Sequence, residues 1–124
     1  MVLKMETKIL RISLSGKTIN IRDFREAKGL MVFKGLMFSS REKSRALLFK
    51  INGSIHSFFV LYEFLILWMD ENNKVVEWKI VKPFSLYEKS HKKFSKILEI
   101  PINRRYFKVV KSIVGERFKN LNKQ

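Results

Sequence analysis

Apolar and polar residues alternate along much of the chain, and this alternation predicts β-strands. In residues 8–14 apolar side chains occupy every second position with one interruption, and residues 18–21 alternate in the same way. Gly16 lies between the two segments, where a tight turn needs the positive φ that glycine readily adopts. The two segments therefore predict a β-hairpin.

Five further strands are predicted from the same pattern. Residues 46–51 are apolar and strand-like, and residues 74–81 and 94–100 have a strand pattern bounded by turn residues or proline. The apolar stretch 55–69 is too long for one strand. We expect it to split near Glu63 into two strands that are buried on both faces.

One segment near the end of the chain has helical rather than strand spacing. Residues 103–113 carry apolar side chains three and four positions apart, with Asn103 as a candidate N-cap and Gly115 where a helix often ends. Together the elements predict a mainly β fold: a single β-sandwich, jelly-roll-like or a partly open barrel, with one short C-terminal helix. We expect residues 1–124 to form a single domain, with 119–124 as a frayed tail.

The composition limits the class of protein. The chain has 124 residues of which 46% are hydrophobic, enough for a core, and it has no cysteine, which excludes disulfides and thiolate metal sites. Charged residues interrupt the first 14 positions, so no signal-peptide core is present there. The apolar stretch 58–69 is shorter than the roughly 18 residues of a membrane span. We predict a cytoplasmic protein with no transmembrane segment.

The strongest compositional signal is the positive charge. The chain has 26 Lys and Arg against 11 Asp and Glu, a net charge of +15, and residues 91–124 carry 10 − 2 = +8 of it. Such an excess favours nucleic acid or another polyanion as a partner. The candidate binding residues are Arg104, Arg105, Lys108, Lys111, Lys92, Lys93 and Lys96, and the alternating Arg41, Lys43 and Arg45 add to the basic surface. A solvated basic face with no partner is the open alternative.

The polar residues form no recognisable catalytic or cofactor motif. The phosphate-binding glycine motifs and the serine-nucleophile motif are absent, so we predict a non-catalytic binding protein without a cofactor. A candidate pocket consists of His56, Met37 and Asp70, although a hydrogen-bonded strand edge, core packing and turn formation explain these three residues better than a binding role does. Glu99 alternates with apolar neighbours, so it either faces solvent or pairs with a basic residue.

Aromatic residues offer a second, different class of function. A concave sandwich face could bind a small ligand or a carbohydrate-like molecule through stacked rings, as other sandwich proteins do by analogy of fold. The aromatic candidates are Phe58, Tyr62, Trp68 and Trp78. The same residues are expected in the core of a mainly β domain, where they would have no ligand.

Several short segments together resemble an uncharacterised family, the domain of unknown function 192. They are a G-L-M-F run at Gly35–Phe38, an L-F pair at Leu48-Phe49, an S-x-H-x-F segment at Ser54–Phe58, and an L-E-x-P-like strand at Leu98–Pro101. Their order and spacing hold from about residue 19 to residue 118. The resemblance implies a β-sandwich of jelly-roll type and no established activity.

The chain departs from that family pattern at three positions. Ser39 stands where the family often has arginine, Val60 where it has methionine, and Leu65 where aspartate is common. If the arginine or the aspartate carries an activity in the family, this chain lacks it.

Overall fold

The computed structural model describes residues 8–27, 40–50, 62–83 and 92–115. Within them the predicted hairpin is confirmed: β1 (Ile9–Leu14) pairs antiparallel with β2 (Lys17–Arg22). The two turn residues, Ser15 and Gly16, have φ of 50° and 81°. Two successive positive φ values match the right-handed twist of the flanking strands, which is why this loop closes a tight hairpin.

The larger sheet has five strands in the order β3-β4-β7-β5-β6. Their bounds are β3 (Arg25–Glu26), β4 (Leu47–Phe49), β5 (Phe64–Met69), β6 (Val75–Val81) and β7 (Lys96–Pro101). β3 runs parallel to β4, and every other neighbouring pair is antiparallel. β7 is therefore the central strand, hydrogen-bonded to β4 on one side and to β5 on the other.

The turn between β5 and β6 is formed by a carboxylate, as its composition predicts. The Asp70 Oδ1 atom accepts hydrogen bonds from the backbone N–H groups of Asn72 at 2.8 Å and Lys74 at 2.9 Å. Asn73 has a φ of 62°, a conformation that asparagine tolerates better than most residues. The second of the two strands predicted from the long apolar stretch is confirmed as β5, which begins at Phe64, whereas the first falls mostly outside the described residues.

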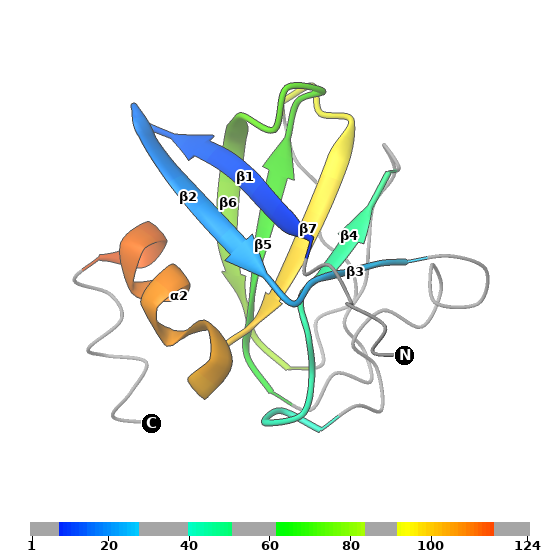
Figure 1. Ribbon diagram of the computed structural model, residues 1–124, viewed down its shortest axis with the longest axis vertical. Helices are drawn as coiled ribbons and strands as arrows, with labels where there is room; N and C mark the ends of the chain where they lie inside the picture. Colours follow the sequence, from blue (N-terminus) through cyan, green and yellow to red (C-terminus); the bar gives the residue numbers. More distant parts are fainter. Residues whose placement is uncertain (1–7, 28–39, 51–61, 84–91, 116–124) are drawn as a thin grey trace, which may run out of the picture.

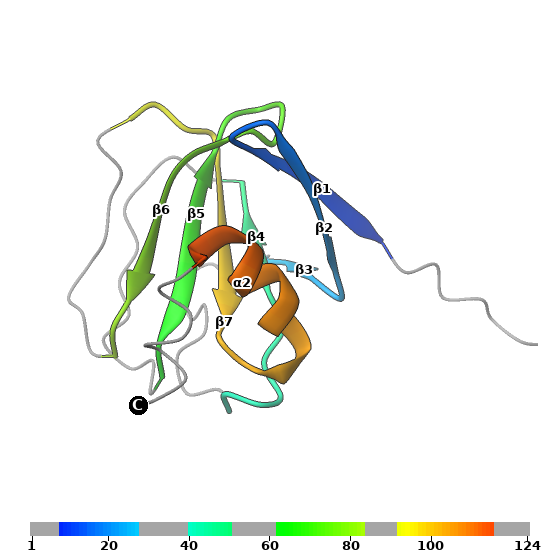
Figure 2. The same ribbon diagram turned by 90° about the vertical axis from the view of Figure 1, so that its left-hand side faces the viewer.

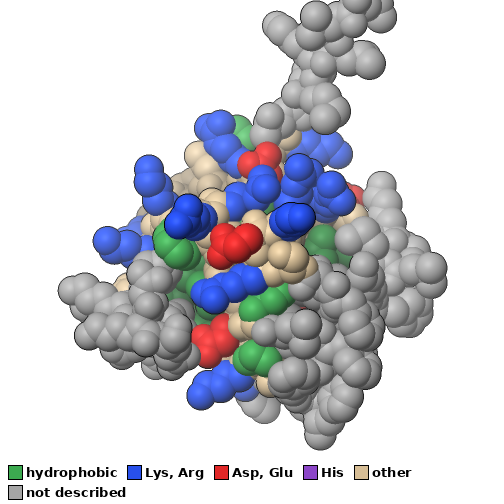
Figure 3. Space-filling model, turned by 90° about the horizontal axis from the view of Figure 1, so that it is seen from below, with side chains coloured by type: hydrophobic (Ala, Val, Ile, Leu, Met, Phe, Trp, Pro, Cys, Tyr) green, Lys and Arg blue, Asp and Glu red, His purple; other side chains and the backbone are tan. Residues whose placement is uncertain are grey.

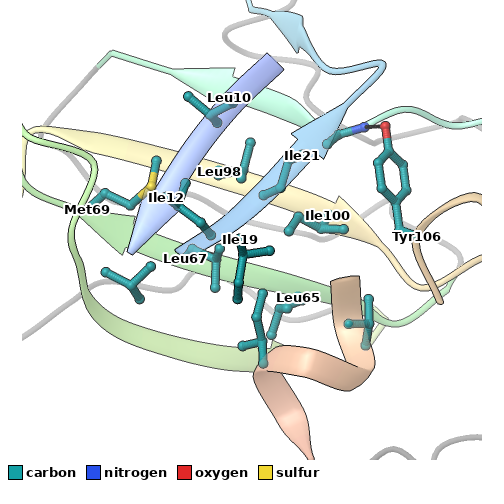
Figure 4. Packing of buried hydrophobic residues seen from close by; sticks show 14 of the residues in the cluster. Leu10, Ile12, Ile19, Ile21, Leu65, Leu67, Met69, Leu98, Ile100 and Tyr106 are labelled. Carbon is teal, nitrogen blue, oxygen red and sulfur yellow. Dashed lines mark hydrogen bonds between the residues drawn. The ribbon is translucent and has the colours of Figure 1, made fainter. Parts of the chain in front are cut away.

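The hairpin lies across one face of the five-stranded sheet (Figures 1 and 2). Figure 4 shows the inward side chains of β1 and β2 above those of β5 and β7. This first core cluster contains, among others, Leu10, Ile12, Ile19, Ile21, Leu65, Leu67, Met69, Leu98 and Ile100. Because strand side chains alternate between faces, the even-numbered residues of β5 belong to the opposite face.

The opposite face of the sheet carries a second core cluster. It consists of Leu47, Phe49, Tyr62, Phe64, Ile66, Trp68, Val81 and Ile97. All six residues of β5 are buried, as predicted for a strand covered on both sides.

The C-terminal helical segment closes one end of the layer between hairpin and sheet. A 3-10 turn, η1 (Arg104–Tyr106), leads into α2 (Phe107–Val114), which contacts β2. The helix buries Val110, Ile113 and Val114, while Lys108 and Lys111 are exposed on its other side. Asn103 occupies the N-cap position of η1, as predicted, but its side chain makes no capping hydrogen bond.

The predicted mainly β class with one short C-terminal helix is confirmed. The finer jelly-roll arrangement stays a prediction. None of the helices in the part of the chain described here is long and apolar enough to cross a membrane.

Candidate anion-binding surface

Two buried polar side chains fasten residues 40–46 to the start of the helical segment. The Tyr106 hydroxyl accepts a hydrogen bond from the Ala46 backbone N–H at 2.8 Å (Figure 4) and donates one to the Asp23 carbonyl at 3.0 Å. Asn103 donates through Nδ2 to the carbonyls of Arg41 at 2.7 Å and Ser44 at 3.0 Å. Burial raises the pKa of Tyr106, so its hydroxyl keeps the proton that this network requires.

Ser44 holds the inner side of the same loop. Its hydroxyl donates to the Ser40 carbonyl and accepts a hydrogen bond from the Tyr62 hydroxyl at 2.8 Å. Ser44 and Tyr62 are both buried, and so are Asn103 and Tyr106. A connected network of buried polar groups therefore holds the loop against the interior, and Arg41, Glu42, Lys43 and Arg45 are exposed.

Six basic residues project from these fastened segments, and we call them the basic corner. They are Arg41, Lys43, Arg45, Arg104, Arg105 and Lys108, and all six are exposed. Two carboxylates lie beside them, Glu42 on the same loop and Asp23 between β2 and β3, so the formal charge of the eight residues is 6 − 2 = +4. Asp23 lies 3.4 Å from the Arg105 guanidinium. Figure 3, which views this end of the molecule, shows many Lys and Arg side chains with several acidic ones between them.

The seven predicted polyanion-binding residues do not form one group. Lys92, Lys93 and Lys96 lie at the start of β7, where the Lys96 ammonium donates to the Asn73 side chain at 2.7 Å and to the Glu71 carbonyl at 3.3 Å. Lys96 is the first residue of β7 and Pro101 the last, roughly 17 Å of extended chain apart, and the C-terminal part of the basic corner begins only after Pro101. Figure 1 shows the two ends of β7 at opposite ends of the sheet.

The basic corner therefore contains some of the seven predicted polyanion-binding residues together with basic residues that were not among the seven. Arg104, Arg105 and Lys108 are joined by Arg41, Lys43 and Arg45, about 60 positions earlier in the sequence. The alternation of the earlier three marked them as a basic face. Their place beside η1 depends on Asn103 and Tyr106, and the sequence pattern gave no signal for those contacts. Lys111 lies one turn farther along α2 and is exposed.

The candidate pocket of His56, Met37 and Asp70 is seen only in part. His56 and Met37 lie outside the described residues, and the Asp70 carboxylate serves the β5–β6 turn. Beside that turn is an open hollow of about 220 Å³, lined by Asp70, Glu71, Lys93, Phe94 and Ser95. In the described ranges no group of three or more His, Cys, Asp or Glu residues could hold a metal ion.

Glu99 is the one described carboxyl group whose surroundings differ from both expectations. It neither faces solvent nor forms an ion pair with a described residue; it is 3% exposed and lies between Leu47 of β4 and Ile66 of β5. Its Oε1 atom has no hydrogen-bond partner among the described residues. Burial raises the pKa of Glu99 from 4.5 to about 8, so the carboxyl group is mostly protonated at pH 7.

The aromatic residues belong mainly to the core. Trp68 is 1% exposed and Tyr62 is 6% exposed, both in the second core cluster. Trp78 is half-buried and packs against the first cluster, and Phe58 lies outside the described residues. Neither tryptophan lines the hollow beside Asp70. The small-ligand prediction therefore gains no support from a described cleft with stacked rings.

Comparison with known proteins adds two similarities. Over 64 residues the chain is 36% identical to the UPF0127 protein TK1120 of Thermococcus kodakarensis, a match that covers 48% of this chain and 38% of that protein. It thus spans well under two thirds of its relative. No family model matches the chain, and the resemblance to the domain of unknown function 192 stays a prediction.

A solved structure supports the fold. A protein of unknown function from Novosphingobium aromaticivorans superposes with a TM-score of 0.64, covering 83% of this chain and 78% of that one. The sequence identity is 14%, so this likeness shows the fold alone.

Proposed function

We propose that this protein binds nucleic acid through the basic corner, with little sequence specificity. The proposal rests on one observation: two basic segments far apart in the sequence are fastened to each other by Asn103 and Tyr106. The fastening concentrates six exposed cations against two carboxylates on one end of the molecule. Chance scattering of the +15 charge over the surface would not require such a network.

The chemistry of the corner suits a phosphate backbone. Four of its six cations are arginine, whose planar guanidinium donates two parallel hydrogen bonds to phosphate oxygens. Each neutralised phosphate releases condensed counterions, so the affinity for duplex DNA falls with salt at a log–log slope of about −0.9 for each contact. Contacts of this kind position a protein on the backbone and carry no base information.

A pair of charge reversals with a matched control tests this proposal. The variant Arg104→Glu/Lys108→Glu changes the corner, and Lys74→Glu/Lys93→Glu makes the same change in net charge with exposed residues near the β5–β6 turn. Fluorescence anisotropy measures the dissociation constant of a labelled 20-nucleotide single strand and a 20-base-pair duplex. We expect the corner variant to bind at least about tenfold more weakly at 100 mM salt, and the control to bind within about threefold of wild type.

Three outcomes would contradict the proposal. They are the absence of wild-type binding at physiological salt, equal losses in the two variants, and a wild-type affinity that does not change with salt. Binding to anionic lipid vesicles but not to either oligonucleotide would identify a membrane surface as the partner and would also overturn the proposal.

A further inference from the structure

Arg41 differs from an ordinary surface arginine because two consecutive residues, Ile102 and Asn103, form hydrogen bonds with its side chain and with its backbone carbonyl. Its Nε atom donates a hydrogen bond to the Ile102 carbonyl at 2.9 Å. Its own carbonyl accepts a hydrogen bond from the Asn103 side chain at 2.7 Å. Ile102 is 3% exposed and Asn103 is fully buried, so both anchors belong to the rigid interior.

This arrangement fixes the direction of the guanidinium group. An arginine has five N–H donors in one plane, and the Ile102 carbonyl uses the one on Nε. No hydrogen bond to a described residue uses the four donors on the two Nη atoms, and Arg41 as a whole is exposed. A free arginine loses side-chain entropy when it grips a ligand, whereas the side chain of Arg41 is already ordered.

Three of the other five cations of the basic corner differ from Arg41. Arg105 lies 3.4 Å from the Asp23 carboxylate, which partly neutralises it. Lys43 and Lys108 carry compact charges that attract a phosphate without the planar, paired geometry of arginine. Arg41 is therefore the best-ordered directional donor that the described hydrogen bonds reveal at this corner.

We propose that Arg41 is the anchor that grips one phosphodiester group of the bound strand through its two Nη atoms. The remaining cations of the corner attract the neighbouring phosphates. The inference rests on the proposed function and deepens it, because it names the residue that sets the register of the backbone and the chemical group that it holds.

The exchange Arg41→Lys tests this role, because it keeps the charge but removes both the Nε bond and the paired donors. Arg11→Lys is the matched control, an identical exchange at an exposed arginine of β1 that lies outside the basic corner. We expect Arg41→Lys to weaken binding of the 20-nucleotide strand about tenfold at 100 mM salt, and Arg11→Lys to weaken it less than about twofold.

A second readout separates contact from support of the loop. In ¹⁵N NMR of the arginine side chains, the Nη signals of Arg41 should shift on titration with the oligonucleotide, while its Nε–H stays protected by Ile102. If wild type binds but Arg41→Lys binds equally well, or if the Arg41 Nη signals do not move, the anchor role is wrong and the proposed function stands. If wild type does not bind, both fail.

Discussion

The burial of Glu99 is determined by the position of its strand in the sheet rather than by its residue type. Leu98, Glu99 and Ile100 alternate as they would in a strand with one wet face, which is why the pattern suggested a solvent-facing glutamate. β7 is the central strand, however, and a core cluster covers each face of its sheet. Glu99 is therefore buried as a neutral acid, which is the form that costs least in an apolar environment.

The stability of the protein should fall as the pH rises because of this residue. In the unfolded chain Glu99 releases its proton near pH 4.5, whereas in the folded protein it keeps the proton up to about pH 8. Between these values the unfolded state binds fewer protons, so the free energy of unfolding decreases by about 1.4 kcal/mol per pH unit from this group. Below pH 4.5 and above about pH 8 its contribution is constant.

Glu99→Gln removes this titration and nearly preserves the shape of the side chain. Urea unfolding at pH 5, 6.5 and 8 should show the variant gaining stability relative to wild type with each step, by several kcal/mol in all. Two curves that stay parallel across this range would mean that Glu99 is ionised in the folded protein.

At the scale of elements, the sequence pattern predicts strands, turns and helices that depend on neighbouring residues. It does not predict the contacts between distant segments. The hairpin β1–β2, the turn after β5 and the helix before Gly115 each follow from a few neighbouring residues. The parallel pairing of β3 with β4 and the fastening of loop 40–46 to η1 depend on partners 20 to 60 positions away. No periodicity specifies which distant segment an asparagine or tyrosine will contact.

The Tyr106 hydroxyl is predicted to stabilise the element that carries half of the basic corner. Tyr106→Phe would leave the Ala46 N–H and the Asp23 carbonyl without their partner, at a cost of about 1–3 kcal/mol in unfolding free energy. Amide hydrogen exchange at Ala46 should become faster than in wild type. Unchanged exchange at Ala46 would show that the hydroxyl does not hold this loop.

At the scale of the whole molecule, the distribution of charge matters more than its sum. The net charge of +15 alone is compatible with solubility and with binding. The basic residues of the C-terminal third lie at both ends of β7. At one end they are joined by the arginines of loop 40–46. At the other end Lys92, Lys93 and Lys96 lie beside the carboxylates of the β5–β6 turn. We therefore predict a nucleic-acid-binding surface at one end of the sheet only.

Backbone NMR during titration of ¹⁵N-labelled protein with the 20-nucleotide strand tests this claim most directly. At 100 mM salt the largest shift changes should fall in residues 40–46 and 103–108, and raising the salt to 400 mM should reverse them. Residues 70–74 and 92–96 serve as the internal control, because they carry lysines at the other end of the same sheet. Shift changes that are larger at 70–74 and 92–96, or equal at both ends, would contradict the account.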